Sequence, residues 1–253
     1  MGISLVILAA GQGSRMDSDL PKVLHSLAAC PLVVHAMRAG RALDPARVVV
    51  VVGHGGEQVA RVVTDEDPEA IIVTQTEQLG TAHAVGQARA ALEDQPGDVV
   101  VLYGDTPFIR AETLDALQTA RASHDVVVLG FHAADPGRYG RLLAHGDRLE
   151  RIVEFKDATE DERAITLCNS GVLCADRATL FDLIAQVGNT NASGEYYLTD
   201  VVGLARARGL TAGVVTCNEA ETLGINTRAE LASAEAAFQA HARTEAFLAR
   251  HLS

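Results

Sequence analysis

Short apolar runs alternate along the first half of the chain with segments whose apolar residues recur at helical spacing. The runs are rich in β-branched residues and have the length of buried strands; they are residues 3–8, 48–52, 70–73 and 99–102. Residues 31–43 place Leu32, Ala36 and Leu43 on one helical face, and a second helix follows Thr81, which we expect to cap it. Strands that alternate with helices predict an α/β fold with a mostly parallel central sheet and helices on both faces.

The second half of the chain is richer in strands. We expect a strand at residues 126–131, a hairpin formed by residues 139–144 and 149–155, and irregular strand-rich sequence up to residue 174. Residues 177–187 predict a helix, residues 195–200 open another, and residues 210–216 predict a late strand. Thr227 and Glu230 fit a capping box at the start of a long Ala-rich helix. No linker or internal repeat interrupts this order.

A glycine-rich turn follows the first predicted strand, in the sequence LAAGQGSRM at residues 8–16. Gly11 and Gly13 allow the backbone to bend tightly, and successive N–H groups in such a turn form an anion-binding concavity. Arg15 and Lys22 add two cations nearby. The turn matches neither the Rossmann fingerprint nor the P-loop, because the third glycine and the Gly-Lys-Ser/Thr triplet are missing. It predicts a site for a phosphorylated ligand; the alternative is a turn that only joins a strand to a helix.

Two further polar residues follow predicted strands. Asp105 could hold a hard cation such as magnesium, or it could cap the turn that begins at Thr106. Gln75 offers both donors and an acceptor and could read the edge of a base, or it could be solvated. Ligands of parallel sheets lie beyond the carboxyl ends of the strands, so we expect Gly11, Gln75 and Asp105 on one rim.

Other polar residues have simpler interpretations. Glu154 and Lys156 alternate outward, as on an exposed strand face, and Asn169 begins a sequence typical of a turn. The Gly-His-Gly-Gly cluster at residues 53–56 is expected to be a structural turn. His83 is expected to pack near a helix start, and none of the nine histidines is given a chemical role.

Composition limits the classes of partner and compartment. The formal net charge of −12 argues against a nucleic acid or a membrane surface as partner. Cys30, Cys168, Cys174 and Cys217 have neither zinc-site nor CxxC spacing and are expected to be reduced thiols. The N-terminal apolar run is too short for a signal peptide, and no stretch has the length of a membrane span. We therefore expect a cytoplasmic protein.

An ordered set of motifs carries a family resemblance over nearly the whole chain. Besides LAAGQGSRM it contains PKVLHSL, VVGHGG, QLGTAHA, YGDTPFI, YGR, VEFKDA, NSG, GEYYLTD and GIN. The first motif resembles the signature of sugar-nucleotide pyrophosphorylases. The combination of QLGTAHA, VEFKDA and GEYYLTD resembles the uridyltransferase domain of the bacterial bifunctional enzyme that makes UDP-N-acetylglucosamine.

The resemblance implies a fold, a reaction and partners. It implies a Rossmann-like nucleotidyltransferase fold with a β-rich sugar-binding part, formed by residues 1–227, and a C-terminal helical arm, residues 228–253. The implied reaction is attack by N-acetylglucosamine 1-phosphate on the α-phosphorus of UTP, with Mg²⁺ as cofactor, giving UDP-N-acetylglucosamine and pyrophosphate. Two anions must meet, so charge neutralisation and alignment are the main tasks.

The resemblance also implies roles for individual residues. The nucleotide site would be lined by Leu8, Ala9, Ala10 and Gly11. Its phosphates would be bound by the catalytic cations Arg15 and Lys22. Uracil would be recognised by Gln75, Gly80 and Thr81. Ribose, sugar and metal would lie near Tyr103, Gly104 and Asp105, with Mg²⁺ bound by Asp105 and Asn226. The sugar would contact Gly140, Glu154 and Asn169, and its phosphate would lie close to Tyr197 and Thr199.

The sequence departs from the family in two respects. Gln12 replaces a residue that is often lysine, which removes one possible phosphate contact, whereas Ser14 keeps the hydroxyl of the usual threonine. The hexapeptide repeats of the acetyltransferase domain do not occur in this sequence. We therefore expect no acetyltransferase activity and a monomer or weak homo-oligomer. The rival hypotheses are a related nucleotidyltransferase with another sugar or base, and a non-catalytic nucleotide-sugar-binding protein.

Overall fold

The computed structural model describes residues 2–11, 13–53 and 55–251, without the side chains of residues 14, 241–242 and 244–251. These residues form a nine-stranded mixed sheet in the order β5-β4-β1-β6-β10-β7-β11-β9-β8, and β2 (Ser26–Leu27) pairs separately with β3 (Cys30–Pro31). The strands of the large sheet are β1 (Ile3–Ala9), β4 (Arg47–Val52), β5 (Ile71–Thr74), β6 (Asp98–Tyr103), β7 (Val126–His132), β8 (Arg141–His145), β9 (Arg148–Val153), β10 (Leu167–Asp176) and β11 (Ala212–Cys217).

The direction of the strands confirms the expected parallel arrangement for only part of the sheet. β5, β4, β1 and β6 are parallel neighbours, and β7 is parallel to β11. β10 is inserted between β6 and β7 and runs antiparallel to both. The predicted hairpin is confirmed as β8 and β9, which pair antiparallel at one edge. The sheet is therefore mixed, with a parallel half and a half that contains antiparallel strands.

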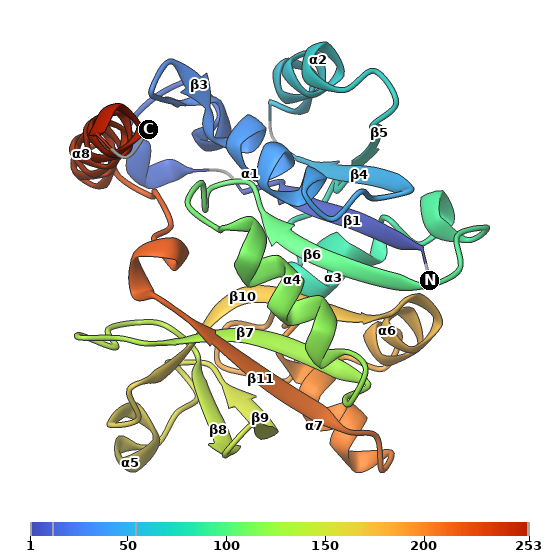
Figure 1. Ribbon diagram of the computed structural model, residues 1–253. Helices are drawn as coiled ribbons and strands as arrows, with labels where there is room; N and C mark the ends of the chain where they lie inside the picture. The colour runs from blue at the N-terminus through green and yellow to red at the C-terminus, as the bar shows by residue number, and fades with distance from the viewer. Residues whose placement is uncertain (1, 12, 54, 252–253) are drawn as a thin grey trace.

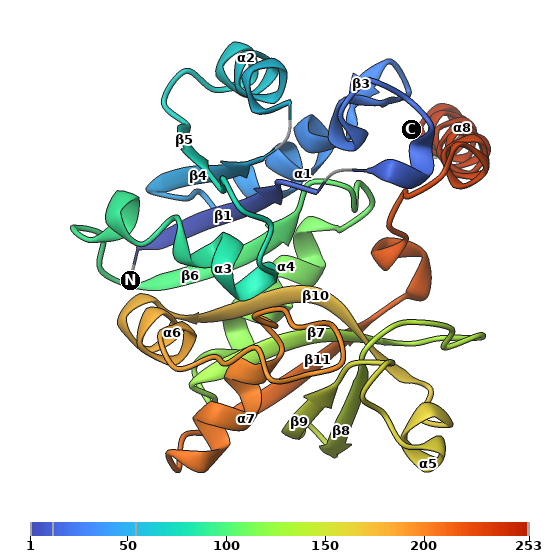
Figure 2. The ribbon, with the colours of Figure 1, turned by 180° about the vertical axis from the view of Figure 1, so that it is seen from behind.

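Helices cover both faces of the sheet (Figures 1 and 2). One face carries α1 (Leu32–Arg41), α2 (Gly56–Glu66) and α4 (Ala111–Ala120), and the other carries α3 (Thr81–Gly86), α6 (Arg177–Ile184) and α7 (Asp200–Ala207). Along β1, Leu5 and Ile7 enter the core of the first face, whereas Val6 and Leu8 enter the core of the second. A strand that is buried on both faces needs a continuous apolar run, which is the pattern seen in the sequence.

The C-terminal helix α8 (Arg228–His251) begins at the predicted capping box. Thr227 Oγ1 accepts from the Glu230 N–H at 3.1 Å, and Glu230 Oε2 accepts from the Thr227 N–H at 3.0 Å. An apolar cluster joins the first half of α8 to the region of β2 and α1; its members are Leu27, Leu32, Phe108, Ile225, Leu231, Ala234 and Phe238. The start of α8 thus lies against the N-terminal part of the chain (Figure 1).

Several local predictions were wrong. Thr81 does not cap α3, because the helix begins after Gly80 and Thr81 Oγ1 instead accepts from the Leu198 N–H at 2.9 Å. β5 is only half-buried, since it lies at the edge of the sheet. The helix expected to open within residues 195–200 does so, at the last of these residues, Asp200, because residues before it pair with another loop. The short helix α5 (Glu160–Arg163), with its own capping box at Thr159, was not predicted.

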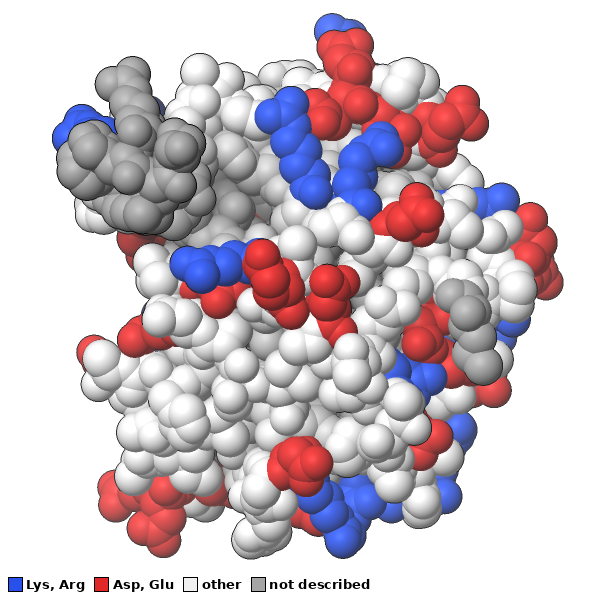
Figure 3. All heavy atoms as spheres, viewed as in Figure 1, with Lys and Arg blue, Asp and Glu red and all other residues white. Residues whose placement is uncertain are grey.

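The surface agrees with the acidic composition. On the face shown in Figure 3, lysine and arginine side chains are interspersed with acidic ones and do not gather into one patch. Among the described helices, none combines the length and the apolar character that a membrane crossing requires.

Candidate active site

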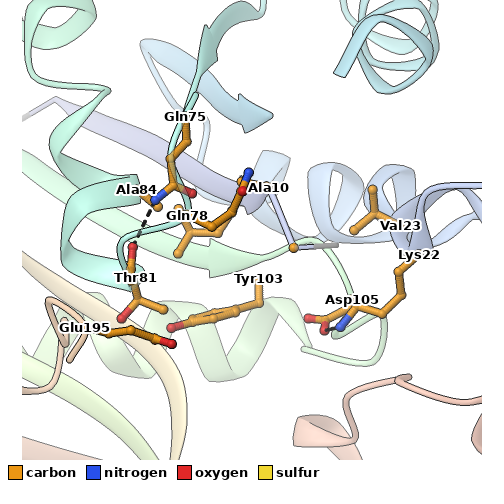
Figure 4. A pocket seen from close by; sticks show the side chains of 13 residues that line it. Ala10, Lys22, Val23, Gln75, Gln78, Thr81, Ala84, Tyr103, Asp105 and Glu195 are labelled. Atoms are coloured by element: carbon orange, nitrogen blue, oxygen red, sulfur yellow. Dashed lines mark hydrogen bonds and ion pairs between the residues drawn. The ribbon is translucent and has the colours of Figure 1, made fainter. Parts of the chain in front are cut away.

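A cavity of about 340 Å³ lies at the carboxyl ends of β1, β5 and β6 (Figure 4). The predicted site residues that line it are Leu8, Ala10, Gly11, Lys22, Gln75, Gly80, Thr81, Tyr103 and Asp105. The prediction that the glycine turn, Gln75 and Asp105 share one rim is therefore confirmed. Four lining residues were not predicted: Val23, Gln78, Ala84 and Glu195.

A cluster of charged and polar side chains lies at one end of the cavity. Lys22 Nζ forms an ion pair with Asp105 Oδ2 and donates to Asn226 Oδ1 at 3.0 Å. Arg15 Nη2 donates to the same Asn226 oxygen at 3.0 Å. The four residues come from the glycine turn, the segment after it, the turn after β6 and the segment before α8. We call this set (Arg15, Lys22, Asp105 and Asn226) the polar cluster.

Gly13 makes room for the lysine of the polar cluster. Its φ of 62° lies in the left-handed region, and a Cβ at this position would be 2.6 Å from Lys22 Cβ. Any larger residue at position 13 must therefore move the segment that carries Lys22. The second glycine of the turn has a positional role, as well as the flexibility that the sequence suggests.

The segment before α8 holds the other side of the polar cluster. The Ile225 N–H donates to the Asp105 carbonyl at 3.0 Å, which places Asn226 beside that carboxylate. Arg228, the first residue of α8, donates from Nε to the Met16 carbonyl at 3.0 Å. The capping box and these two contacts fix the helix start against the glycine turn. Arg228 was not predicted to support the site, because the sequence around it gives no sign of its hydrogen bond to Met16.

The polar cluster contains oxygen donors that suit a magnesium ion. Asp105 Oδ2 and Asn226 Oδ1 already converge on one positive charge, the Lys22 ammonium group. Magnesium is typically bound by one or two protein oxygens together with waters and substrate phosphates. No group of three or more His, Cys, Asp or Glu side chains in the described part of the chain has metal-binding geometry. The donor set therefore fits a metal that is shared with a phosphate ligand.

The opposite end of the cavity is formed by Gln75 and the loop that follows it. Gln75 is only 3% exposed, and its Nε2 donates to the Gly80 carbonyl at 3.1 Å. The loop is paired with residues before α7: the Tyr196 N–H donates to the Leu79 carbonyl at 2.8 Å, and the Ala82 N–H donates to the Tyr196 carbonyl at 2.9 Å. This pairing places the segments that carry the QLGTAHA and GEYYLTD motifs side by side.

Glycine is required where these two loops cross. Gly80 has a φ of 115°, and a Cβ there would be 2.5 Å from the Tyr196 carbonyl oxygen. The second glycine cluster also packs against the site, since a Cβ on Gly53 would be 2.6 Å from the Ala10 carbonyl oxygen, and Gly55 precedes α2. Part of this cluster thus forms the predicted structural turn; His54 lies outside the described residues.

Tyr103 lies between the main cavity and a second, smaller one. Burial raises the pKa of its hydroxyl, and the carboxylates of Glu154 and Asp105 raise this pKa further, so the ring stays neutral. Gly171, with a φ of 92°, leaves room for the ring, because a Cβ there would be 2.5 Å from Tyr103 Cε2. The second cavity is lined by Tyr103, Val128, Ile152, Asn169, Gly171, Leu173, Leu198 and Thr199.

Glu154 lies next to this second cavity and is not on an exposed strand face. Its Oε1 accepts from Thr199 Oγ1 at 3.0 Å, and a Cβ on Gly140 would be 3.4 Å from both carboxylate oxygens. The Asn169 N–H donates to the Gly140 carbonyl at 2.9 Å. Burial raises the pKa of the Glu154 carboxyl, and the nearby Asp200 carboxylate acts in the same direction. The predicted sugar-contacting residues are thus brought together, whereas Lys156 is exposed.

Some predicted residues lie beside the cavities without lining them. The Ala9 side chain packs in the core under α1, α2 and α4, on the other face of the sheet. A Cβ on Gly104 would be 3.2 Å from the Leu8 carbonyl oxygen, so Gly104 packs closely against β1. Tyr197 lines neither cavity. Gln12 lies outside the described residues, so its role stays a prediction.

Residues 5–179 match the family model of the MobA-like NTP transferase domain. This chain is a member of the MobA-like NTP transferase family. The strands, helices and glycine turn that form the main cavity lie within the matched part of the NTP transferase domain. Asn226 and the start of α8 lie beyond it and complete the polar cluster.

Curated relatives match most of this chain. This chain is 66% identical over 244 residues to the bifunctional protein GlmU of Cereibacter sphaeroides, covering 96% of this chain and 54% of the relative. It is 64% identical over 245 residues to bifunctional protein GlmU of Ruegeria pomeroyi, covering 97% and 54%. The chain thus spans about half the length of the curated relatives it matches.

Two solved structures share the fold. The inositol-1-phosphate CTP transferase from T. maritima superposes with a TM-score of 0.72 at 20% identity, covering 90% of each chain. A UDP-glucose pyrophosphorylase complexed with UDP-glucose has a TM-score of 0.73 at 15% identity, covering 95% of this chain and 100% of the other. At this identity the likeness shows the fold, which is the expected Rossmann-like α/β nucleotidyltransferase fold.

Proposed function

We propose that the chain transfers UMP from UTP to N-acetylglucosamine 1-phosphate, releasing pyrophosphate. The observation that carries the proposal is the polar cluster: two cations, a carboxylate and an amide from distant segments meet at one end of a cavity whose other end is the Gln75 amide. A nucleoside triphosphate needs both features, cations for its phosphates and a hydrogen-bonding edge for its base. The resemblance of the motifs and the 66% identity to a bifunctional protein GlmU support this substrate pair.

The proposed chemistry forms one bond and breaks one bond. A phosphate oxygen of the sugar phosphate attacks the α-phosphorus of UTP, and the bond between the α-phosphorus and the bridging oxygen of pyrophosphate breaks. The attacking oxygen is already ionised near neutral pH, so no general base is required. In this proposal Arg15 and Lys22 stabilise the charge that grows on the leaving pyrophosphate.

We infer that Asp105 and Asn226 are the protein ligands of the Mg²⁺ cofactor. The bound ion supplies charge neutralisation between phosphate oxygens, as is usual in phosphoryl and nucleotidyl transfer. Because Lys22 pairs with Asp105 and donates to Asn226, its ammonium group is within reach of phosphates that approach the metal ligands. The lysine is thus placed to help neutralise those phosphates.

We propose that residues around the smaller cavity contact the sugar; the cavity itself, at about 10 Å³, has room for about one water molecule, so the sugar would lie beside it. Glu154 and Thr199 provide a half-buried acceptor and a hydroxyl, Asn169 provides an amide, and Gly140 leaves space beside the carboxylate. Such a set suits a ligand with several hydroxyl groups and an N-acetyl group. We assign this part, within residues 1–227, to sugar binding and residues 228–253 to a helical arm.

We propose that the active form is a monomer or weak homo-oligomer and that it works in the cytoplasm. The test is a panel of nucleoside triphosphates and sugar 1-phosphates, with pyrophosphate release and product mass as readouts. We expect UTP with N-acetylglucosamine 1-phosphate to be the preferred pair, and EDTA to abolish turnover. Preference for another pair would favour a related nucleotidyltransferase, and binding without turnover would favour a nucleotide-sugar-binding protein.

A further inference from the structure

The Gln75 side-chain amide is held in one orientation at the end of the main cavity. Its Nε2 lies 3.1 Å from the Gly80 carbonyl oxygen and 3.0 Å from His83 Nδ1. A primary amide has two N–H donors, and these contacts use both of them. Figure 4 shows the amide oxygen on the other side, facing Ala10 and Gln78 across the space that these residues line. A ligand in the cavity therefore meets a hydrogen-bond acceptor.

His83 and Gly80 together account for this orientation. The Gly80 carbonyl can only accept, so it selects the nitrogen end of the amide. His83 Nδ1 selects the same end when it carries no proton, because an unprotonated ring nitrogen is an acceptor. The reversed amide would bring its oxygen to hydrogen-bond distance of two other acceptors. Buried polar groups that oppose one another in this way are costly, since neither is satisfied.

The other side of the imidazole does not decide where the ring proton lies. A neutral imidazole that accepts at Nδ1 carries its proton on Nε2. His83 Nε2 lies 3.2 Å from Gln87 Nε2, which also donates to the His83 carbonyl at 3.1 Å. A half-turn of the Gln87 amide would set its oxygen against that carbonyl, so Gln87 provides no acceptor for the Nε2 proton. The assignment of Nδ1 as an acceptor rests on the contacts of Gln75 with Gly80 and His83.

We propose that His83 is a positioning residue that determines which base the site accepts. It holds the Gln75 amide oxygen toward the ligand, and this acceptor favours a base that presents a ring N–H next to a carbonyl, as uracil does at N3. Cytosine presents a lone pair at N3, so it would place an acceptor against an acceptor. The inference rests on the proposed function, in which Gln75 faces the base, and it adds the residue that fixes the polarity of that contact.

The test measures binding of UTP and CTP by calorimetry, with the full chain and without sugar phosphate. His83→Leu removes the Nδ1 acceptor and leaves a side chain of similar size. His83→Asn places an amide oxygen near the position of Nδ1. We expect His83→Leu to lower the ratio of UTP to CTP affinity by about tenfold, the effect of one misplaced hydrogen bond. His83→Asn should restore most of the ratio. In a Gln75→Leu background, His83→Leu should leave the ratio unchanged, because the two residues act through one contact.

Each outcome separates the two proposals. A wild-type protein that binds UTP no better than CTP overturns the proposed uracil selection, and this inference with it. A wild-type preference for UTP that His83→Leu leaves unchanged overturns the role of His83 alone, even if both affinities fall together, because a structural role would weaken both nucleotides equally. Thermal unfolding confirms that each variant is folded, and His83→Ala serves as a second variant without the acceptor.

Discussion

Gly13 offers a direct test of whether the position of Lys22 matters for catalysis. Replacement of Gly13 by alanine places a methyl group 2.6 Å from Lys22 Cβ. Non-bonded carbon atoms normally lie about 3.5–4.0 Å apart, so the two segments must separate by roughly 1 Å. A displacement of about 1 Å in a catalytic group can reduce turnover by about a hundredfold. We therefore expect Gly13→Ala to lower kcat by about two orders of magnitude.

The substitution also strains the backbone, and a matched control separates the two effects. Gly146, in the turn of the β8–β9 hairpin, has a φ of 64°, close to the 62° of Gly13, and has no atom within 4 Å of its added Cβ position. Both alanine variants should lose about 1–2 kcal/mol of unfolding free energy from the left-handed conformation. Only the variant at position 13 meets a side chain of the polar cluster.

The assay is pyrophosphate release at saturating substrates and magnesium, together with urea denaturation of the same samples. We expect Gly146→Ala to lose stability with kcat unchanged, and Gly13→Ala to lose both. If Gly13→Ala is folded and keeps a kcat within about threefold of the wild type, the position of Lys22 does not limit the transition state and the reasoning is wrong.

Three further predictions concern the polar cluster and Glu154. Arg15→Ala should lower kcat by about a hundredfold, more than it raises the KM for UTP, because its charge acts on the leaving pyrophosphate; a change in KM alone would assign it to ground-state binding. Asp105→Ala and Asn226→Ala should each raise the magnesium concentration needed for half-maximal activity, with a less than additive double variant; full activity of either at low magnesium would remove that residue from the metal site. Burial raises the pKa of the Glu154 carboxyl above its ordinary value of 4.5, so the folded protein keeps this proton to a higher pH than the unfolded chain does. The free energy of unfolding therefore falls as the pH rises from the unfolded pKa through the folded pKa. Glu154→Gln should therefore gain stability relative to the wild type as pH rises, measured by urea midpoints; a difference that does not change with pH would contradict this.

The fold was predictable where hydrophobic pattern alone decides the structure. β1, β4 and β6 are buried on both faces, so their sequences are continuous apolar runs and were identified correctly. The insertion of β10 between β6 and β7 was not predictable, because an apolar run does not encode its neighbours. The short helix α5 was missed although its sequence carries a signal, a threonine followed by glutamate three residues later at Thr159.

Only part of the site could be predicted from the sequence. The glycine turn, Gln75 and Asp105 share one rim because each follows a parallel strand, which is a rule of such sheets. Asn226 lies beside Asp105 because the neighbouring Ile225 N–H donates to the Asp105 carbonyl. The local sequence gives no sign of this contact, and only the family resemblance indicated that the two residues act at one site. Glu154 alternates like an exposed residue, yet its partner Thr199 lies 45 positions further along the chain.

The most direct test of the central claim follows the phosphates of UTP. The chain is incubated with magnesium, N-acetylglucosamine 1-phosphate and UTP that carries radiolabel either in the α-phosphate or in the γ-phosphate. The account predicts that the α-label appears in UDP-N-acetylglucosamine and the γ-label in pyrophosphate, in equal amounts and only when both substrates are present. Release of label without formation of the sugar nucleotide, or no reaction at all, would contradict it.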